Sequence, residues 1–287
     1  MLRRTESGDT RYFHEVILKL ANKGFYVDNC VTSVSDELTL NMFLQEATMI
    51  MAEGKFDLRG WEFTRKDSNY NNEDVVPLPV LGLMWDPVRD TLNFNPSCLK
   101  EMISQEEYIT KRIILSMAQR VFDPIGSMFP ATLVPKLLLQ EFWNKNLTWD
   151  EPVDEDTSVE FRNWFHELPS LLEIAIPRWV DIVPTSDFVC SIHTFCDTSN
   201  SAYSAVIFLR VVKNQQLSVH LLAAKSRLAP IQKKGKMLLA ATIGARFFRN
   251  VIDNFEFKEI TSYFWSDLST VISWIQRKEE WATFVWT

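Results

Sequence analysis

Two runs of apolar and β-branched residues, each the length of one strand, end on an aspartate. Residues 191–199 read SIHTFCDTS and carry Asp197, while residues 260–267 read ITSYFWSD and end on Asp267. Both runs are rich in β-branched and aromatic residues, and small polar residues follow each aspartate, as is typical of a strand that runs into a turn. The pattern therefore predicts two strands whose ends each carry a carboxylate.

The residues around these runs predict a layered domain. Two more apolar runs, at 202–210 and 216–224, are separated by polar turns and are expected to be strands. Residues 236–252 and 269–275 have apolar residues at helical spacing. Three successive strands, a helix, a fourth strand and a second helix make an α/β layer arrangement, which we expect to begin near residue 184.

The N-terminal part predicts a short mixed region. A helix is expected over residues 12–21, followed by a hairpin whose tip is Asp28-Asn29, a dipeptide that tolerates the positive φ of a tight turn. Ser35 is expected to cap a helix that Gly54 ends. A strand over residues 56–63 and a loop over residues 66–79 complete this region.

The middle of the chain predicts one hairpin and then helices. The hairpin pairs residues 80–85 with residues 91–94 around a polar turn. Ser104 with Glu107 forms a capping box for a helix that ends near residue 121, and Thr157 with Glu160 forms a second one. A further helix is expected over residues 131–144, and the prolines that mark the passage to the last domain are Pro169, Pro177 and Pro184.

The paired aspartates are the strongest candidate for chemistry. Two carboxylates at neighbouring strand ends can share a hard cation, and oxygen ligands suit Mg²⁺ or Mn²⁺. The alternative is structural, because Asp commonly follows a strand as a turn or helix-capping residue. The pattern alone leaves both interpretations open for Asp197 and Asp267.

The charge balance bears on the partner. The formal net charge of −7 argues against strong general affinity for nucleic acid. A local basic cluster that includes Lys225 and Arg227 is a candidate phosphate contact, although such a run is more often a solvated loop. No secretory signal and no membrane-spanning run is recognised, so we expect an intracellular, cytoplasmic or nuclear protein.

The cysteines are expected to be core residues. Four cysteines in 287 residues do not form a disulfide framework. Cys190, His193 and Cys196 suggest a metal site, but strand alternation places His193 on the opposite face from the two cysteines. We therefore predict no three-ligand site there.

Several segments in a fixed order resemble the Pol polyprotein of Bel/Pao-type long-terminal-repeat retrotransposons. They are, in chain order, 25–30 (FYVDNC), 80–86 (VLGLMWD), 122–126 (FDPIG), 137–143 (LLLQEFW), 222–230 (LAAKSRLAP) and 264–275 (FWSDLSTVISWI). The ordered set is more specific than any one segment, and it extends over nearly the whole chain.

The resemblance implies an α+β and α/β fold in four stretches. After a loose N-terminus (1–9) come a partial reverse-transcriptase palm (10–77), a thumb- or connection-like helical region (78–184) and a C-terminally truncated RNase H-like mixed sheet with helices (185–287). It implies RNA-directed DNA synthesis and hydrolysis of an RNA–DNA hybrid as the family's reactions, with Mg²⁺ or Mn²⁺ as cofactor. Asp28, Asp197 and Asp267 match the family's metal-binding and catalytic acids, and Lys225 and Arg227 are the candidate nucleic-acid contacts.

The chain departs from the family's pattern at several acids. Asn29 stands at the second acidic position of the polymerase hairpin, and Met237 stands where the family places a Glu on the helix after the third strand. A thioether binds Mg²⁺ poorly, and the remaining acid of the nuclease set would follow Thr287. We therefore expect no polymerase activity from this polypeptide alone and little or no hydrolysis of a hybrid.

The sequence leaves three hypotheses open. The first is an impaired reverse transcriptase/RNase H fragment, and the second is a non-catalytic, host-encoded remnant that binds nucleic acid or protein. The third is a translated relic without function. The oligomeric state stays open as well.

Overall fold

The computed structural model describes residues 25–26, 29–34, 36–64, 76–96, 99, 108–180, 182, 187–229, 236–253, 260–267 and 269–276. The chain divides into two compact units, residues 1–70 and residues 71–287. The boundaries expected at 77/78 and 184/185 stay predictions. No helix in the described part of the chain is both long and apolar enough to cross a membrane.

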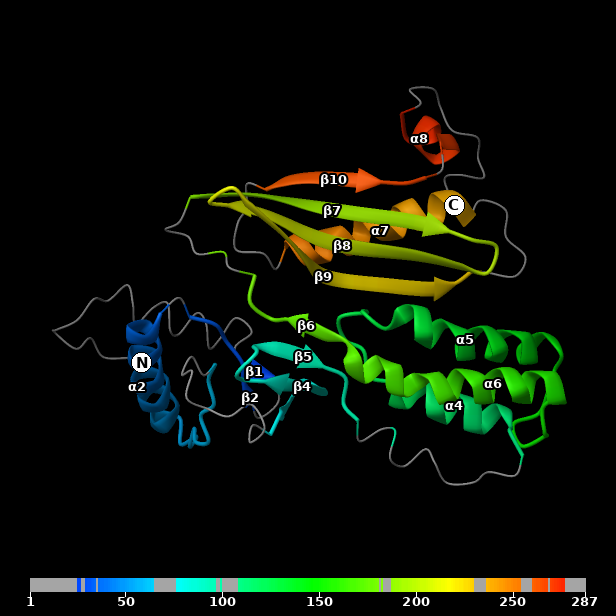
Figure 1. The fold of residues 1–287 in the computed structure, drawn as a ribbon, viewed down its shortest axis with the longest axis horizontal. Coiled ribbons are helices and arrows are strands. Elements are labelled where there is room, and N and C mark those ends of the chain that lie inside the picture. The colour runs from blue at the N-terminus through cyan, green and yellow to red at the C-terminus, as the bar shows by residue number, and fades with distance from the viewer. Residues whose placement is uncertain are drawn as a thin grey trace. The chain divides into compact units, whose positions relative to one another are not determined.

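The described residues of the first unit form a hairpin and one helix (Figure 1). Strands β1 (Phe25–Tyr26) and β2 (Asn29–Cys30) pair antiparallel, which confirms the hairpin, although Asp28 itself and the helix expected over 12–21 lie outside the described residues. Helix α2 (Glu37–Glu53) ends at Gly54 as predicted. Its N-cap is Asp36 rather than Ser35, because the Asp36 carboxylate accepts the Thr39 amide at 2.8 Å.

The strand predicted over residues 56–63 is wrong. The described backbone there is irregular, and two of its apolar side chains, Leu58 and Trp61, pack against α2 instead of facing a partner strand. Trp61 meets Phe43 edge to face, with ring centroids 6.3 Å apart. The apolar residues of this segment therefore serve packing against a helix rather than strand pairing.

The second unit begins with an antiparallel sheet in the order β3-β4-β5-β6. Its strands are β3 (Leu78–Val80), β4 (Leu83–Asp86), β5 (Thr91–Asn93) and β6 (Ala175–Pro177). The β4–β5 hairpin confirms the prediction, but a continuous strand over 80–85 is wrong, since Leu81 and Gly82 turn the chain with φ of 51° and 81°.

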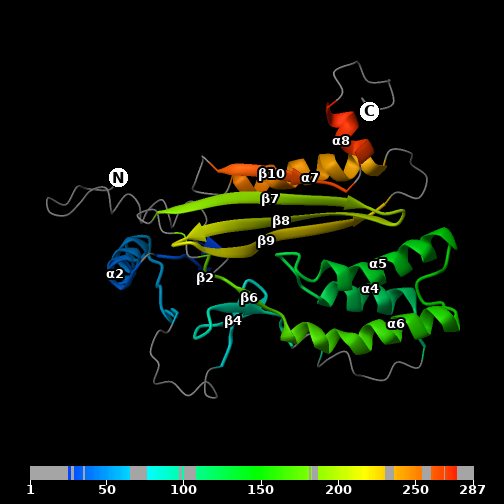
Figure 2. The same cartoon turned by 45° about the horizontal axis from the view of Figure 1, so that its top comes forward.

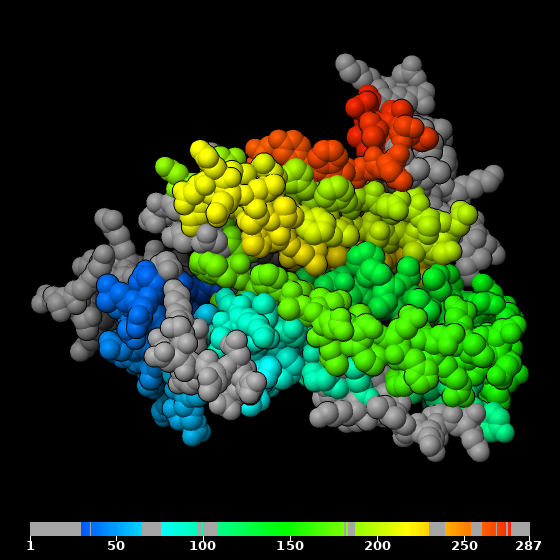
Figure 3. Space-filling model, viewed as in Figure 1, coloured from blue at the N-terminus to red at the C-terminus, as the bar shows by residue number. Residues whose placement is uncertain are grey.

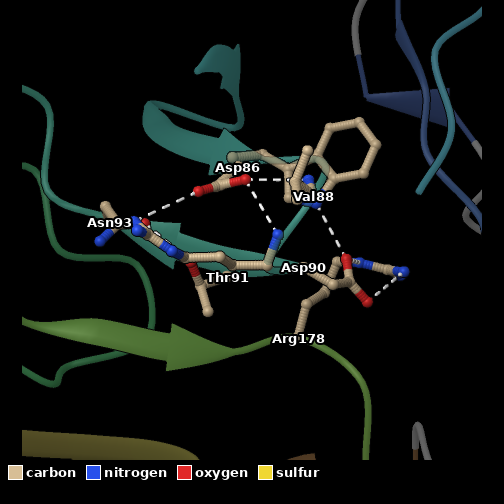
Figure 4. Close-up of polar contacts among 8 residues, drawn as sticks. Asp86, Val88, Asp90, Thr91, Asn93 and Arg178 are labelled. Atoms are coloured by element: carbon tan, nitrogen blue, oxygen red, sulfur yellow. Dashed lines mark hydrogen bonds and ion pairs between the residues drawn. The ribbon is translucent and has the colours of Figure 1, made fainter. Parts of the chain in front are cut away.

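Polar side chains secure this small sheet (Figure 4). Asp86 accepts the backbone amides of Val88 and Arg89 at 2.8 and 3.0 Å, which shapes the turn between β4 and β5. Asp90 accepts two hydrogen bonds from the Arg178 guanidinium, at 2.7 and 3.0 Å. This bidentate pair joins the turn to the chain just after β6, far away in sequence.

Three helices follow the hairpin and form the largest described core. They are α4 (Lys111–Arg120), α5 (Phe129–Asn144) and α6 (Glu155–Glu167), with a 3₁₀ turn, η3 (Leu168–Glu173), after α6. Helix α5 ends at Asn144, as predicted. Buried apolar side chains fill the space between them, among them Ile114, Leu138, Phe142, Phe161, Trp164 and Leu168.

The helix starts predicted from the two capping boxes are corrected where the described residues test them, while Ser104 and Glu107 themselves lie outside those residues. A continuous helix from Ser104 is wrong, because residues 108–110 are not helical and Thr110 caps α4. Asp154 rather than Thr157 caps α6, accepting the amide of Thr157 at 2.9 Å. That hydrogen bond is the largest cause of the lowered pKa of Asp154.

The C-terminal part is a mixed sheet in the order β10-β7-β8-β9. The strands are β7 (Phe188–Thr198), β8 (Ala202–Lys213), β9 (Gln216–Leu228) and β10 (Thr261–Trp265). Helix α7 (Lys236–Ile252) covers one face, and α8 (Ser269–Gln276) follows β10 (Figures 1 and 2). This confirms the predicted order of elements, including both ends of α7.

One face of this sheet is buried, because every second side chain along its strands is apolar and points toward α7. Ile192, Ile207, Leu209 and Val211 point the same way and pack against Phe247 and Phe248 of α7, among other partners. Thr194 and Cys196 continue this buried row along β7. The opposite face, which we call the open face, carries the other half of each strand's side chains.

A glycine turn joins the helical region to β9. The amide of Ala224 donates to the carbonyl of Ile125 at 2.7 Å, and the Gln140 side chain donates to the carbonyl of Ala229 at 3.0 Å. Gly126, the residue after Ile125, has a positive φ of 86°. A Cβ on Gly126 would lie 1.8 Å from the carbonyl oxygen of Ala224, so only glycine fits there.

We expect Gly126→Ala to lower the free energy of unfolding by about 2–4 kcal/mol, since the side chain adds backbone strain and a clash. Thermal or urea unfolding measures the loss. Gly60→Ala is the control, because Gly60 also has a positive φ but no atom within 4 Å of the added Cβ. Equal losses at the two positions would contradict the close approach to Ala224.

Candidate functional site

The two sequence-predicted aspartates lie at neighbouring strand ends. Strand β10 pairs parallel with β7, and Trp265 is opposite Phe195 in the register. Asp197 and Asp267 each follow two residues after this pair, so the backbone brings both to the same level of the sheet. Neighbouring strands lie about 4.8 Å apart, which is close enough for two carboxylates to reach one cation.

Asp197 belongs to the open face. Its neighbour Cys196 points toward α7, since a Cβ on Gly244 of α7 would lie 2.0 Å from the Cys196 sulfur. Alternation along β7 then directs Phe195 and Asp197 to the other side. The carboxylates of Asp197 and Asp267 are both exposed, and Asp197 accepts the amide of Thr198 at 2.6 Å.

Position 237 lies at the same edge of the sheet. Met237 is the second residue of α7. One turn later, Ala240 packs against Tyr203, and Tyr203 is the β8 partner of Thr198. The first turn of α7 is therefore level with the end of β7 where Asp197 lies. Since α7 covers the face opposite Asp197, an acidic side chain at position 237 would have to reach past the end of the strand to share a cation with it.

The described residues hold no group of three or more His, Cys, Asp or Glu side chains gathered as metal ligands. Cys196 packs toward α7, and Cys190 packs against the cluster that contains Ile192, while His193 belongs to the open face. Burial raises the pKa of both thiols, which keeps them in the protonated form that binds metal poorly. The donor set that fits a hard cation is the pair Asp197 and Asp267.

The basic candidates lie on the face that carries α7. Lys225 pairs with Ala205 in the register, and its ammonium lies 5.8 Å from the ring centroid of Phe247. Arg227 pairs with Tyr203 on that face. Both side chains are exposed, but alternation separates them from Asp197, which the strand directs to the open face. Asp28 lies outside the described residues, so the structure brings together only Asp197 and Asp267.

The sequence reasoning missed a cluster of rings beside the aspartates. Rings from β7 and β10 lie nearly parallel on the open face, the closest pair being His193 and Tyr263 with centroids 4.9 Å apart. Phe195 and Trp265 stack at 5.9 Å. A signal was present, because ring-bearing residues stand two and four positions before each aspartate.

Comparisons with known proteins agree with this fold. The family model of the Pao retrotransposon-like RNaseH-like domain matches residues 110–268, a range that includes Asp197 and Asp267. No curated protein sequence matches the chain.

Two solved structures are similar to the chain. One is the foamy viral protease-reverse transcriptase dRH in complex with ds DNA, with a TM-score of 0.52, 8% identity, and coverage of 96% of this chain and 45% of that one. The other is the foamy viral protease-reverse transcriptase in complex with dsDNA, with a TM-score of 0.49, 11% identity, and coverage of 96% and 54%. The chain thus spans about half the length of these two relatives. Since the family model matches more than half of its residues, the chain belongs to the Pao retrotransposon-like family of RNase H-like domains, which confirms the resemblance read from its sequence.

Proposed function

We propose that residues 185–287 form a weakened RNase H site in which Asp197 and Asp267 hold one Mg²⁺ or Mn²⁺. The parallel register of β7 and β10 carries this proposal, because it sets the two carboxylates at adjacent strand ends. The expected reaction is slow hydrolysis of an RNA–DNA hybrid, or none. The proposed place of action is inside the cell, in the cytoplasm or nucleus, where such hybrids form.

The donor set explains the weakness. Carboxylate oxygens suit hard cations, and a bound ion would stabilise the negative charge that develops on a phosphodiester. Two carboxylates supply less charge and fewer ligands than three, and Met237 offers only a thioether. Both aspartates are also exposed, so water competes with them for the ion. Affinity in the millimolar range follows.

The nucleic-acid partner is proposed to be a hybrid or another duplex. Lys225 and Arg227 are the proposed phosphate contacts, since both are exposed and cationic, and they would contact phosphates on the α7 face of the sheet, away from the Asp197 carboxylate on the open face. The net charge of −7 confines any attraction to such local groups. Binding that depends on a few phosphate contacts should weaken steadily as salt is added.

A non-catalytic binding module is the second candidate function. Met237 and Asn29 stand where the family resemblance places acids, and neither side chain supplies a carboxylate ligand for a cation. In this case the chain would bind nucleic acid or a protein partner without cleaving the hybrid. Binding with no hydrolysis in Mn²⁺ would favour this second function.

We expect Asp197→Asn and Asp267→Asn each to weaken Mn²⁺ binding about tenfold, because each removes one charged ligand. Isothermal titration of the purified chain measures the affinity. Asp187→Asn is the matched control, since this exposed aspartate precedes β7 at the opposite end of the strand. If the control weakens Mn²⁺ as much as the two site variants, or if the wild type binds no ion, the site is wrong.

We expect Met237→Glu to tighten Mn²⁺ binding about tenfold, since it returns a carboxylate to the edge where Asp197 lies. Hydrolysis of a labelled RNA–DNA hybrid should rise with it. Met237→Gln serves as the control, because it has nearly the same shape and no charge. Unchanged affinity in Met237→Glu would count against the position of this residue in the site.

A further inference from the structure

Four rings form a row across the open face, which we call the aromatic row: Tyr263, His193, Trp265 and Phe195. Neighbouring centroids along the row are 4.9, 6.0 and 5.9 Å apart, and the planes of each pair meet at 19° or less. Phe208 of β8 adds an edge-to-face contact with Phe195. The rings therefore stand side by side on the sheet.

Hydrogen bonds fix the orientation of the two central rings of this row, His193 and Trp265. The Trp265 indole donates to Nδ1 of His193 at 3.1 Å, so that nitrogen is an acceptor. Nε2 of His193 then carries the proton and donates to the hydroxyl of the buried Ser191 at 3.0 Å. A ring set held this way loses little conformational freedom when a flat ligand stacks on it.

The row is open to solvent although it is apolar. Phe195, Tyr263 and Trp265 keep 44%, 47% and 49% of their surface exposed. The space-filling view shows this sheet at the surface, with β10 in orange along its edge (Figure 3). Exposed rings that are grouped and pre-oriented mark an interaction site more than scattered ones do.

Two observations bear on the ligand. Each strand of the row continues within two residues to one of the aspartates, a span of about 7 Å, or roughly two nucleotides at the rise of one duplex strand. Arg210 lies on the same open face, opposite Ser191 in the register, and among the described residues no carboxylate forms an ion pair with it. The Arg210 guanidinium, the rings and the Asp197 carboxylate therefore belong to one face of the sheet, and Asp267 follows the end of the neighbouring strand.

We propose that the aromatic row is a stacking site for the bases of single-stranded nucleic acid, on which one strand rests beside Asp197 and Asp267. The proposal rests on the proposed function for nucleic acid as the class of partner, and it goes beyond that function by assigning the row to a single strand rather than to the duplex proposed for the carboxylates. Bases stack on aromatic side chains with little regard to sequence, whereas a duplex keeps its bases inside and cannot use the row. An aliphatic protein partner would not require parallel rings aligned with the carboxylates.

The test measures the binding of a fluorescein-labelled twelve-nucleotide oligo(dT) by anisotropy in EDTA, so that the cation site does not contribute. The wild type should bind it about tenfold more tightly than an abasic strand of the same length, which keeps the phosphates but lacks the bases. Trp265→Leu should remove most of that difference, and Phe195→Leu should do the same.

Phe264→Leu is the matched control, because Phe264 lies between Tyr263 and Trp265 on β10 but packs against Phe248 of α7. It should leave binding unchanged, and circular dichroism checks that every variant is folded. Equal affinity for the base-bearing and abasic strands overturns the proposal, as does an equal loss in Phe264→Leu. Self-association of the wild type that Trp265→Leu abolishes would assign the row to a protein interface instead.

These outcomes separate the two proposals. If the wild type binds no Mn²⁺ but still binds oligo(dT) more tightly than the abasic strand, the nuclease site is rejected and the aromatic row is kept. If the wild type binds oligo(dT) and the abasic strand equally well, and Asp197→Asn still weakens Mn²⁺ binding, only the aromatic row is rejected.

Discussion

The pairing of β10 with β7 is the interaction on which the site depends. The two strands run parallel, so their C-terminal ends meet at one edge of the sheet (Figure 1). A parallel pair needs a long crossover, and here α7 provides it between β9 and β10. Without that pairing, Asp197 and Asp267 would be two unrelated turn residues, and the rings of β7 and β10 would not align.

The packing of α7 protects this arrangement from one side. Gly244 lets the helix approach Cys196 closely, and the apolar half of each strand is buried beneath it. The other half is left on the open face, where it can meet a ligand. At β9 the turn around Gly126 joins the helical region to the sheet by a main-chain hydrogen bond. The sheet is thus held by its helix on one face and by a neighbouring segment at β9, and the strand ends that carry the aspartates stay exposed.

Local pattern predicted much of this fold, because the elements follow their own periodicity. Helix α7 has the ends expected from its apolar spacing, and β7, β8 and β9 extend the predicted strands by a few residues. Long-range pairing could not be predicted from local pattern. Strand β6 pairs with β5, and the Asp90–Arg178 ion pair adds a second link between the same two distant parts of the sequence. The caps failed for a local reason, since Asp36 and Asp154 compete with nearby Ser and Thr as acceptors of the first helical amides.

The candidate site was predicted in part. The strand–aspartate pattern identified the two carboxylates, but not the faces on which other side chains lie. Lys225 and Arg227 look close to the site in sequence terms, yet the alternation of β9 places them with α7. The aromatic row escaped notice because each strand contributes only half of it, and only the register joins the halves.

The most direct test is a crystal structure of the chain grown with Mn²⁺, with anomalous diffraction used to locate the ion. The account predicts one anomalous peak at about 2.0–2.4 Å from a carboxylate oxygen of Asp197 and from one of Asp267. Carboxylates on opposite faces of the sheet, or a peak bound elsewhere with none between these two residues, would contradict it.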